Sequence, residues 1–262
     1  MSNEQIKFLK KIKFNKIIIF ITQIIIGLTF LISWELLSHY EIINSFIFSS
    51  PSKIIKCLIE LYQQNNLFNH IFITTLEVFI SFILGSIISF IIAIIFYMIP
   101  TSKKIFDPYI TMLNSLPKVA LGPIIIIWMG ANNTSIIVMA LLINLIVSLV
   151  GFYNGFINTD TYKIKLLKTM KAKKIQILTK LIIPANLENI LSTLKLNISM
   201  SLIGVIMGEF LVSKEGIGYL ILYGTQVFNL NLVMTGIFIL IILSFCFYKT
   251  ITLIEKITLK KQ

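Results

Sequence analysis

The dominant pattern along this chain is a series of long stretches without charged residues, separated by short polar segments. The stretches reach about 20 residues, the length at which an α-helix crosses roughly 30 Å of hydrocarbon. The pattern predicts an all-α membrane protein, a single transmembrane domain over residues 1–262. Six spans are expected, at about residues 17–37, 76–99, 108–129, 134–156, 186–212 and 231–249.

The first predicted span follows basic residues, as the apolar core of a signal peptide does. The run from Ile17 to Trp34 is uncharged and has no small-residue cleavage site. We therefore expect an uncleaved first span. The third and fourth spans are expected to form a hairpin that turns between Gly130 and Ser135.

Composition agrees with this class of protein. The chain is 56% hydrophobic and 13% charged, with a mean hydropathy of +0.91, which is too apolar for one soluble core. The net charge of +12 comes from lysines that cluster at the ends of apolar runs. A nucleic-acid-binding protein would instead carry basic residues and aromatics over a soluble face, so no nucleic acid is expected as a partner.

The lysines also predict the orientation in the membrane, because cytoplasmic loops carry an excess of basic residues. With both termini in the cytoplasm, only Lys53, Lys56 and Lys214 lie outside, while Lys118 and Lys195 fall within spans. The other eighteen are cytoplasmic: seven in residues 157–183, and Lys7, Lys10, Lys11, Lys13, Lys16, Lys103, Lys104, Lys249, Lys256, Lys260 and Lys261.

The longest cytoplasmic connection runs from Asp160 to Pro184 and has apolar residues at nearly helical spacing, with lysines on the other faces. Such a helix can lie on anionic membrane lipid, where each lysine contributes about 1 kcal/mol. Alternatively, it can be presented to a cytoplasmic partner. Its place between two spans favours the partner.

Two stretches, NSLPKVALGPIIIIWMG (residues 114–130) and PANLENILSTLKLNISMSLIGVIMGEFLVSKEGIGYLI (residues 184–221), carry a family resemblance. They resemble the inner-membrane permease subunits of ABC importers, in particular those that handle sulfonates, taurine, nitrate and related small solutes. The similarity extends from Phe46 to the last span. It implies a multi-pass protein of the bacterial cytoplasmic membrane.

The resemblance also implies partners. Permeases of this kind work in pairs, so a second copy is expected. Two ABC ATPase subunits would use ATP and magnesium, and an extracytoplasmic binding protein would deliver the solute to the outer surface of residues 38–75 and 213–230. The permease itself would hold no cofactor.

In that family the cytoplasmic loop docks on the ATPase through a Glu-Ala-Ala, three residues, Gly, then Ile-x-Leu-Pro pattern. Aligned on Pro184, the family's glutamate and glycine fall at Lys165 and Lys171, which depart from it, and the alanines at Leu166 and Leu167. Glycine allows the turn between two short helices, which lysine makes harder. The positions that fit are Ala172, Ile177 and Pro184, and Ile182 is a further apolar member of the loop.

Glu209 is a charged residue near the outer end of the fifth predicted span, where a charge marks a pathway or a buried pair. It lies roughly 21 Å along the helix from Lys195, so these two cannot pair within one helix. Lys195 is expected to reach the cytoplasmic end of its span. Glu209 either caps the backbone amides of Gly216–Gly218 or contacts solute.

Other polar and small residues have two interpretations each. Gly204 and Gly208 can pack closely within the chain or across a dimer interface. Pro117 and Pro123, around Lys118, can form an ordinary kink or break a helix at a transport site near the start of the third span. The remaining candidates are Asn114 and Asn144, expected to face the interior, and Glu35 and Glu77, expected at the membrane interface.

The sequence offers no constellation for catalysis or metal binding. Cys57, expected in a loop, and Cys246, expected in the last span, are far apart, and His39 and His70 are isolated. We therefore expect a transport subunit and not an enzyme. The predicted pathway residues are Asn114, Pro117, Asn144, Glu209, Gly216 and Gly218. The rival class is a self-contained channel or secondary transporter. It is disfavoured because the predicted spans contain few acidic residues.

Overall fold

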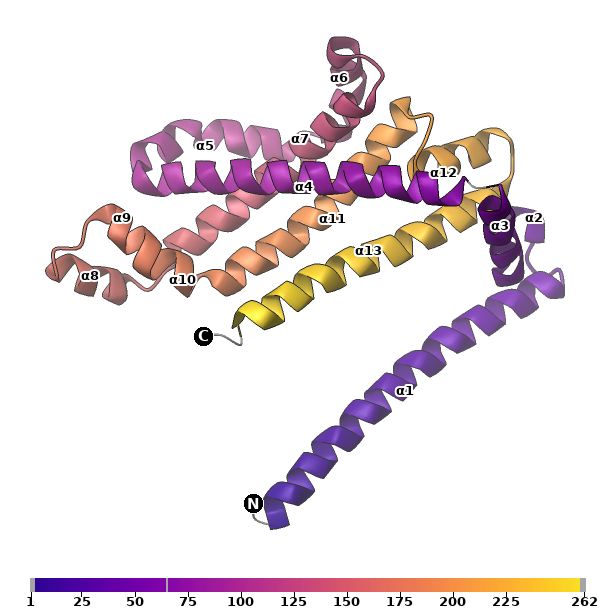
Figure 1. Ribbon diagram of the computed structural model, residues 1–262, viewed down its shortest axis with the longest axis horizontal. Helices are drawn as coiled ribbons and strands as arrows, with labels where there is room; N and C mark the ends of the chain where they lie inside the picture. The colour runs from indigo at the N-terminus through magenta and orange to yellow at the C-terminus, as the bar shows by residue number, and fades with distance from the viewer. Residues whose placement is uncertain (1–2, 65, 260–262) are drawn as a thin grey trace.

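The computed structural model describes residues 3–64 and 66–259, and every element of secondary structure in them is a helix (Figure 1). The prediction of an all-α fold is confirmed. In chain order the elements are α1 (Asn3–His39), α2 (Ser45–Phe48), α3 (Pro51–Gln63), α4 (Leu67–Met98), α5 (Pro100–Ser115), η1 (Lys118–Leu121), α6 (Gly122–Met129), α7 (Asn133–Ile157), α8 (Thr161–Thr169), α9 (Lys174–Ile177), the π-helical η2 (Leu178–Ile182), α10 (Ile183–Ala185), α11 (Leu187–Val212), α12 (Ile217–Gln226) and α13 (Leu230–Leu259).

Five helices are long and apolar enough to cross a membrane, and a sixth crossing requires a bent pair. Five of the six predicted spans fall on these helices to within one residue, but the predicted third span, residues 108–129, does not form one straight helix. Its two halves, in Pro100–Ser115 and Lys118–Met129, are bent by 90°. Leu116 is extended (ψ 136°) because the residue before a proline avoids the helical conformation, and Pro117 lacks an N–H. The break therefore lies within the predicted span and not at its start.

Helices α4, α7 and α11 pack together as the centre of the molecule (Figure 1). Gly204 of α11 approaches α7 so closely that a Cβ there would lie 2.4 Å from the Ala140 Cα. Gly208 packs in the same way on Ile136. The small-residue pair thus serves close packing within the chain, which was one of its two interpretations.

Helix α1 runs away from the central helices, and the apolar window within Phe14–His39 buries none of its residues inside the chain (Figure 1). Its C-terminal end is attached to α3. The Glu35 carboxylate accepts hydrogen bonds from the Ser52 backbone N–H (3.0 Å) and hydroxyl (2.7 Å). This places a negative charge at the N-terminus of α3, where the helix dipole favours it.

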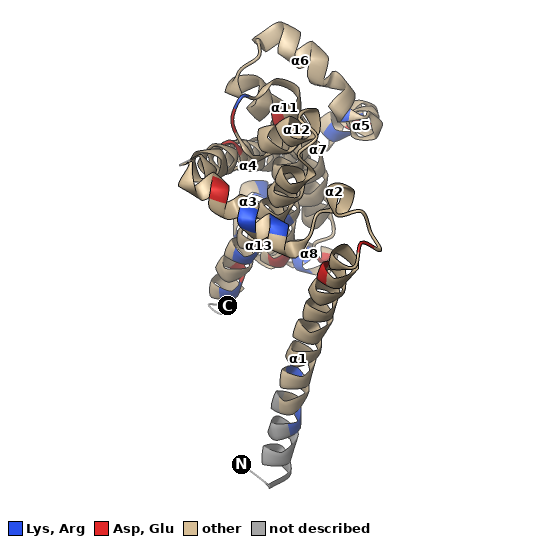
Figure 2. Cartoon of the chain, turned by 90° about the vertical axis from the view of Figure 1, so that its right-hand side faces the viewer, with Lys and Arg blue, Asp and Glu red and all other residues tan. Residues whose placement is uncertain are grey.

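The two ends of the molecule differ in what they carry. The helices α8–α10 and both chain termini lie toward the left of Figure 1, and α2, α3 and α12 lie at the right. Figure 2 shows lysines in the N-terminal half of α1 and near the end of α13, with most of the long helices uncharged. Lys260 and Lys261 lie outside the described residues. This arrangement agrees with the orientation that the lysines predict.

Candidate functional site

The end of α11 and the start of α12 form a buried polar cluster with α4. A short connection follows α11, and α12 begins after Gly216, whose φ is +103°. The first backbone N–H groups of any helix have no partner within the helix and require one from outside. In α12 they find it on side chains of α4 and α11. We call this cluster the outer cap: His70, Thr74, Glu77, Glu209 and residues 216–218.

Glu209 is the centre of the outer cap and is completely buried. Its carboxylate accepts the Gly218 N–H at 2.5 Å and the Thr74 hydroxyl at 2.6 Å. Thr74 in turn accepts the Ile217 N–H at 2.9 Å. Of the two roles expected for Glu209, this geometry is that of a cap, because a carboxylate at a helix N-terminus both satisfies free N–H groups and opposes the helix dipole.

The glycines of the outer cap are required by the approach of this carboxylate. A Cβ at Gly216 would lie 2.4 Å from Glu209 Oε1, and one at Gly218 would lie 2.7 Å from Oε2. Gly216 also has a φ that other residues rarely adopt. The glycine-punctuated stretch after α11 therefore allows the backbone to reach a buried acid.

His70 belongs to the outer cap, although the sequence alone left it as an isolated residue. Its Nδ1 accepts the Gly216 N–H at 2.9 Å, and its ring stacks at 6.0 Å on Tyr219 of α12. Thr74 was also missed. The signal available in the sequence was the spacing of His70, Thr74 and Glu77, which places polar residues on one face of an apolar helix.

The prediction for Glu77 is wrong. It was expected at the membrane interface, yet its side chain is only 1% exposed. It lies beside Glu209 on the inner side of the outer cap. The reason is that α4 begins at Leu67, well before the predicted span, so that Glu77 is about two turns further into the packed helices.

Asn144 lies in the packed interior, where it joins three helices. Its amide donates to the Ser81 carbonyl of α4 (3.0 Å) and to the Ser201 hydroxyl of α11 (2.6 Å). A Cβ at Gly85 would lie 2.1 Å from its Oδ1, so α4 and α7 touch at this level. Asn144, predicted as a pathway residue, is thus fully buried and holds α4, α7 and α11 together.

Asn114 and Pro117 lie at the broken helix and are both exposed. Asn114 lines a cavity of about 350 Å³ between α4, α5 and α7. The cavity also holds Lys103, which forms an ion pair with Asp107 and lies 5.4 Å from the centre of the Tyr153 ring. The cavity therefore combines a few polar groups with an apolar wall, as ligand-binding clefts do.

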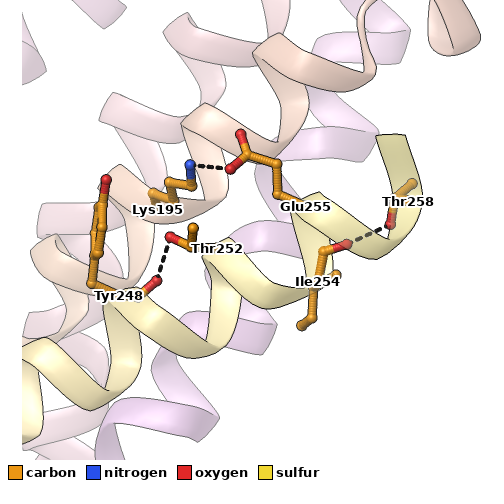
Figure 3. Close-up of polar contacts among 6 residues, drawn as sticks. All are labelled: Lys195, Tyr248, Thr252, Ile254, Glu255 and Thr258. Atoms are coloured by element: carbon orange, nitrogen blue, oxygen red, sulfur yellow. Dashed lines mark hydrogen bonds and ion pairs between the residues drawn. The ribbon is translucent and has the colours of Figure 1, made fainter. Parts of the chain in front are cut away.

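Lys195 forms an ion pair with Glu255 of α13 (Figure 3). The Nζ and Oε2 atoms are 2.5 Å apart, and the ammonium lies 5.6 Å from the centre of the Tyr248 ring. Lys195 was expected from the sequence to reach the cytoplasmic end of its span, and its partner Glu255 lies near the C-terminal end of α13. The lysine side chain is 16% exposed, so the pair ties α11 to α13 largely out of solvent.

The cytoplasmic loop folds into short helices with a tight turn between α8 and α9. Lys171 occupies the left-handed conformation (φ +58°). The N–H of Lys171 binds the Lys168 carbonyl at 2.9 Å, and that of Ala172 binds the Leu167 carbonyl at 3.0 Å. These are the two hydrogen bonds of a Schellman motif, which usually has glycine at the position of Lys171. The turn expected of a glycine is therefore made by a lysine.

One face of this loop is packed against the membrane helices. Ile177, Leu178 and Ile182 are buried with Phe152 and Phe156 of α7, and Leu167 and Ala172 pack against the same cluster. Pro184 lies in α10, shortly before α11 begins. The loop is therefore attached rigidly to the membrane helices.

The opposite face of the loop is open. Leu166 and Met170 are 62% and 70% exposed, and Lys165 is exposed beside them. Tyr162 and Ile175 of the same loop are also exposed. We call this open face the loop face. An exposed apolar patch with basic residues around it is typical of a protein interaction surface.

Long apolar helices, a break at a proline and a rigid cytoplasmic loop define a multi-pass transport protein. The family model of the binding-protein-dependent transport system inner membrane component matches residues 85–258. The chain belongs to this family, as the sequence motifs predicted, and is a multi-pass protein of the inner membrane.

Relatives in other organisms are transport permeases. The chain is 26% identical over 238 residues to the formylaminopyrimidine transport permease protein ThiX of Halalkalibacterium halodurans, covering 90% of this chain and 94% of that one. It is 20% identical over 217 residues to the taurine transport system permease protein TauC of Escherichia coli, covering 81% and 79%.

The fold is similar to a solved one. A chain of the MetNI methionine ABC transporter, in inward-facing conformations, superposes with a TM-score of 0.63, covering 73% of this chain and 95% of that one. The sequences are 17% identical, so the likeness concerns the fold.

Proposed function

We propose that this chain is the permease subunit of an ATP-driven importer for a small solute of the sulfonate, taurine, nitrate or vitamin-precursor type. The names of the relatives support this solute class, and family membership supports the importer. The observation that carries the proposal is the loop face, because it is an apolar surface on a loop whose other side is packed into the membrane helices.

The loop face is the surface for an ABC ATPase. Leu166 and Met170 supply apolar contact, and the lysines around them select an acidic groove on the ATPase. One of these lysines, Lys165, stands where the family pattern has a glutamate. Two ATPase subunits, with ATP and magnesium bound to them, would face two copies of this chain. The permease contributes no catalytic group, and closure of the ATPases biases it between two states.

The outer end supplies the surface for a solute-binding protein. Helices α3 and α12, within residues 38–75 and 213–230, border a cavity of about 370 Å³ lined by Glu60, Gln64 and Tyr223 among others. Solute passes from there between the permease copies and leaves through the cavity beside Asn114 at the cytoplasmic end. The Lys103–Asp107 pair is partly exposed, with side-chain exposures of 21% and 59%, so it costs little to separate and a solute anion can take the place of Asp107.

The test is co-purification from the native host. A tagged chain is extracted in mild detergent, and the associated proteins are identified by mass spectrometry. The variant L166E/M170E changes only exposed side chains of the loop face. Its matched control is I55E, because Ile55 is 58% exposed on α3 at the other end of the molecule.

We expect a P-loop ATPase with the native chain and with I55E, and its loss with L166E/M170E. An ATPase that stays bound to the loop variant contradicts the assignment of the loop face. If no ATPase accompanies any intact version and the chain transports solute alone in vesicles, the self-contained transporter is the correct class.

A further inference from the structure

The Glu77 carboxyl is a buried acid that the proposed function does not use. Glu77 and Glu209 are 1% and 0% exposed, and their carboxyl groups lie side by side between α4 and α11. Among the described residues the ion pairs join Lys103 to Asp107 and Lys195 to Glu255, so no lysine in that part of the chain compensates the two glutamates.

The hydrogen bonds of the two acids are unequal. Glu209 accepts one donor on each oxygen, the Thr74 hydroxyl and the Gly218 N–H. Both oxygens of Glu77 are buried, and no donor from the described residues reaches them. A buried ionised carboxylate without donors or a cation is very costly, and two side by side are more so. The two carboxyl groups therefore require one bound proton between them.

We propose that Glu77 and Glu209 form a proton-binding site in which one proton, carried by Glu77, is donated to the Glu209 carboxylate. The unequal hydrogen bonds decide which acid carries it, because donors stabilise the ionised form of Glu209 and nothing stabilises an ionised Glu77. A metal ion is not indicated, since the described residues contain no group of three or more metal-type side chains.

The site connects proton binding to the outer cap. Glu209 holds the start of α12 through the Gly218 N–H, and the Thr74 hydroxyl together with the proton on Glu77 attaches Glu209 to α4. Loss of the proton would leave two negative charges in contact, which loosens the attachment of α12 to α4 and α11. The state with the cap attached binds one more proton than the loosened state, so rising pH favours the loosened state.

Other titratable groups face the same region and must be separated from Glu77. His70 of α4 accepts the Gly216 N–H, and its protonation in acid would remove that acceptor. The negative charge of Glu215, in the connection before α12, interacts electrostatically with His70, and the Tyr219 ring of α12 stacks on the His70 ring. Protonation of His70 would alter the outer cap only as the pH falls, and Glu215 and Tyr219 affect it through His70. Loss of the Glu77 proton alters the outer cap as the pH rises, so the two effects occur in opposite directions of pH.

The experiment uses the full-length chain, purified in detergent, as wild type, E77Q and E60Q. Glu60 is an exposed glutamate of α3 at the same end, so E60Q is the matched control for a lost carboxyl. Infrared spectroscopy detects the carbonyl stretch of a protonated carboxylic acid separately from that of a carboxylate. Thermal unfolding is followed from neutral to alkaline pH, in sodium chloride and in choline chloride.

We expect the protonated-acid band in wild type and E60Q and its loss in E77Q. The unfolding midpoint of wild type and E60Q falls as the pH rises, and that of E77Q stays level. E77M, which also removes the acid, serves where E77Q does not fold. An unchanged band or an unchanged pH dependence in the Glu77 variants overturns the proposal. A midpoint that rises with sodium but not with choline overturns it too, because the ligand is then Na⁺.

Discussion

The ion pair between Lys195 and Glu255 offers a quantitative test of how α11 and α13 are held together (Figure 3). The perturbation is a double-mutant cycle of K195M, E255L and K195M/E255L. Each single change leaves one charge without its partner at a site where the side chains are 16% and 18% exposed. The double change leaves two apolar side chains that can pack.

The burial decides the expected magnitude. Breaking a buried pair costs about 3–5 kcal/mol, and a pair with some solvent access falls near 3 kcal/mol. K195M also loses the contact with the Tyr248 ring, worth about 0.5–1 kcal/mol. Replacing both partners by apolar groups is close to neutral. The losses are then about 3 kcal/mol in E255L, about 3.5–4 kcal/mol in K195M and about 0.5–1 kcal/mol in the double variant, so the coupling energy should be about 6 kcal/mol in favour of the pair.

The assay is equilibrium unfolding of the purified chain by a denaturing detergent, followed by circular dichroism. K256M is the matched control, because Lys256 is an exposed lysine next to Glu255. Its stability should stay within about 0.5 kcal/mol of wild type. If the loss in the double variant equals the sum of the two single losses, the pair carries no coupling and the reasoning is refuted.

Three further changes test other parts of the structure. G216A should destabilise the chain by at least about 2 kcal/mol, because Gly216 has a φ of +103° and a Cβ would lie 2.4 Å from Glu209 Oε1; unchanged thermal unfolding would contradict this. K171G should slow amide exchange in α8 and α9, because glycine adopts the left-handed φ of +58° at this position more easily than lysine does. The expected net gain in stability of the turn is about 0.5–1 kcal/mol. Faster exchange would show that the turn is not strained. Burial raises the pKa of the Cys57 thiol, so a maleimide should label it slowly at neutral pH and faster as the pH rises toward that pKa; in a C246S background, labelling as fast as in the detergent-unfolded chain would contradict its burial.

The membrane class and the family could be predicted because their signals are local. An uncharged run of span length has the same meaning wherever its neighbours lie, and the motif residues from Asn114 and from Pro184 are contiguous. Pro117 and Pro123 also predicted either a kink or a break in the helix. The angle of 90° between the two halves, Pro100–Ser115 and Lys118–Met129, could not be predicted, because the packing of α5 on α4 and α7 decides it.

The outer cap could be predicted only in part. The two glycines and Glu209 lie within ten residues of one another, so capping was a possible interpretation of the sequence alone. His70 and Thr74 contact residues 146 and 143 positions away along the chain, and no local pattern contains such a contact. Glu77 was placed at the interface because the start of α4 was set too late by hydropathy.

The sequence by itself determined that this chain is helical, lies in a membrane, has its lysines mainly at one end and belongs to an importer permease family. These properties follow from side-chain hydrophobicity and charge, which act on each segment separately. Only the tertiary structure decided which buried polar groups meet: Glu209 with Gly218, Asn144 with Ser201, and Lys195 with Glu255. A polar group away from water must find a partner, and the partner is set by which helices pack together.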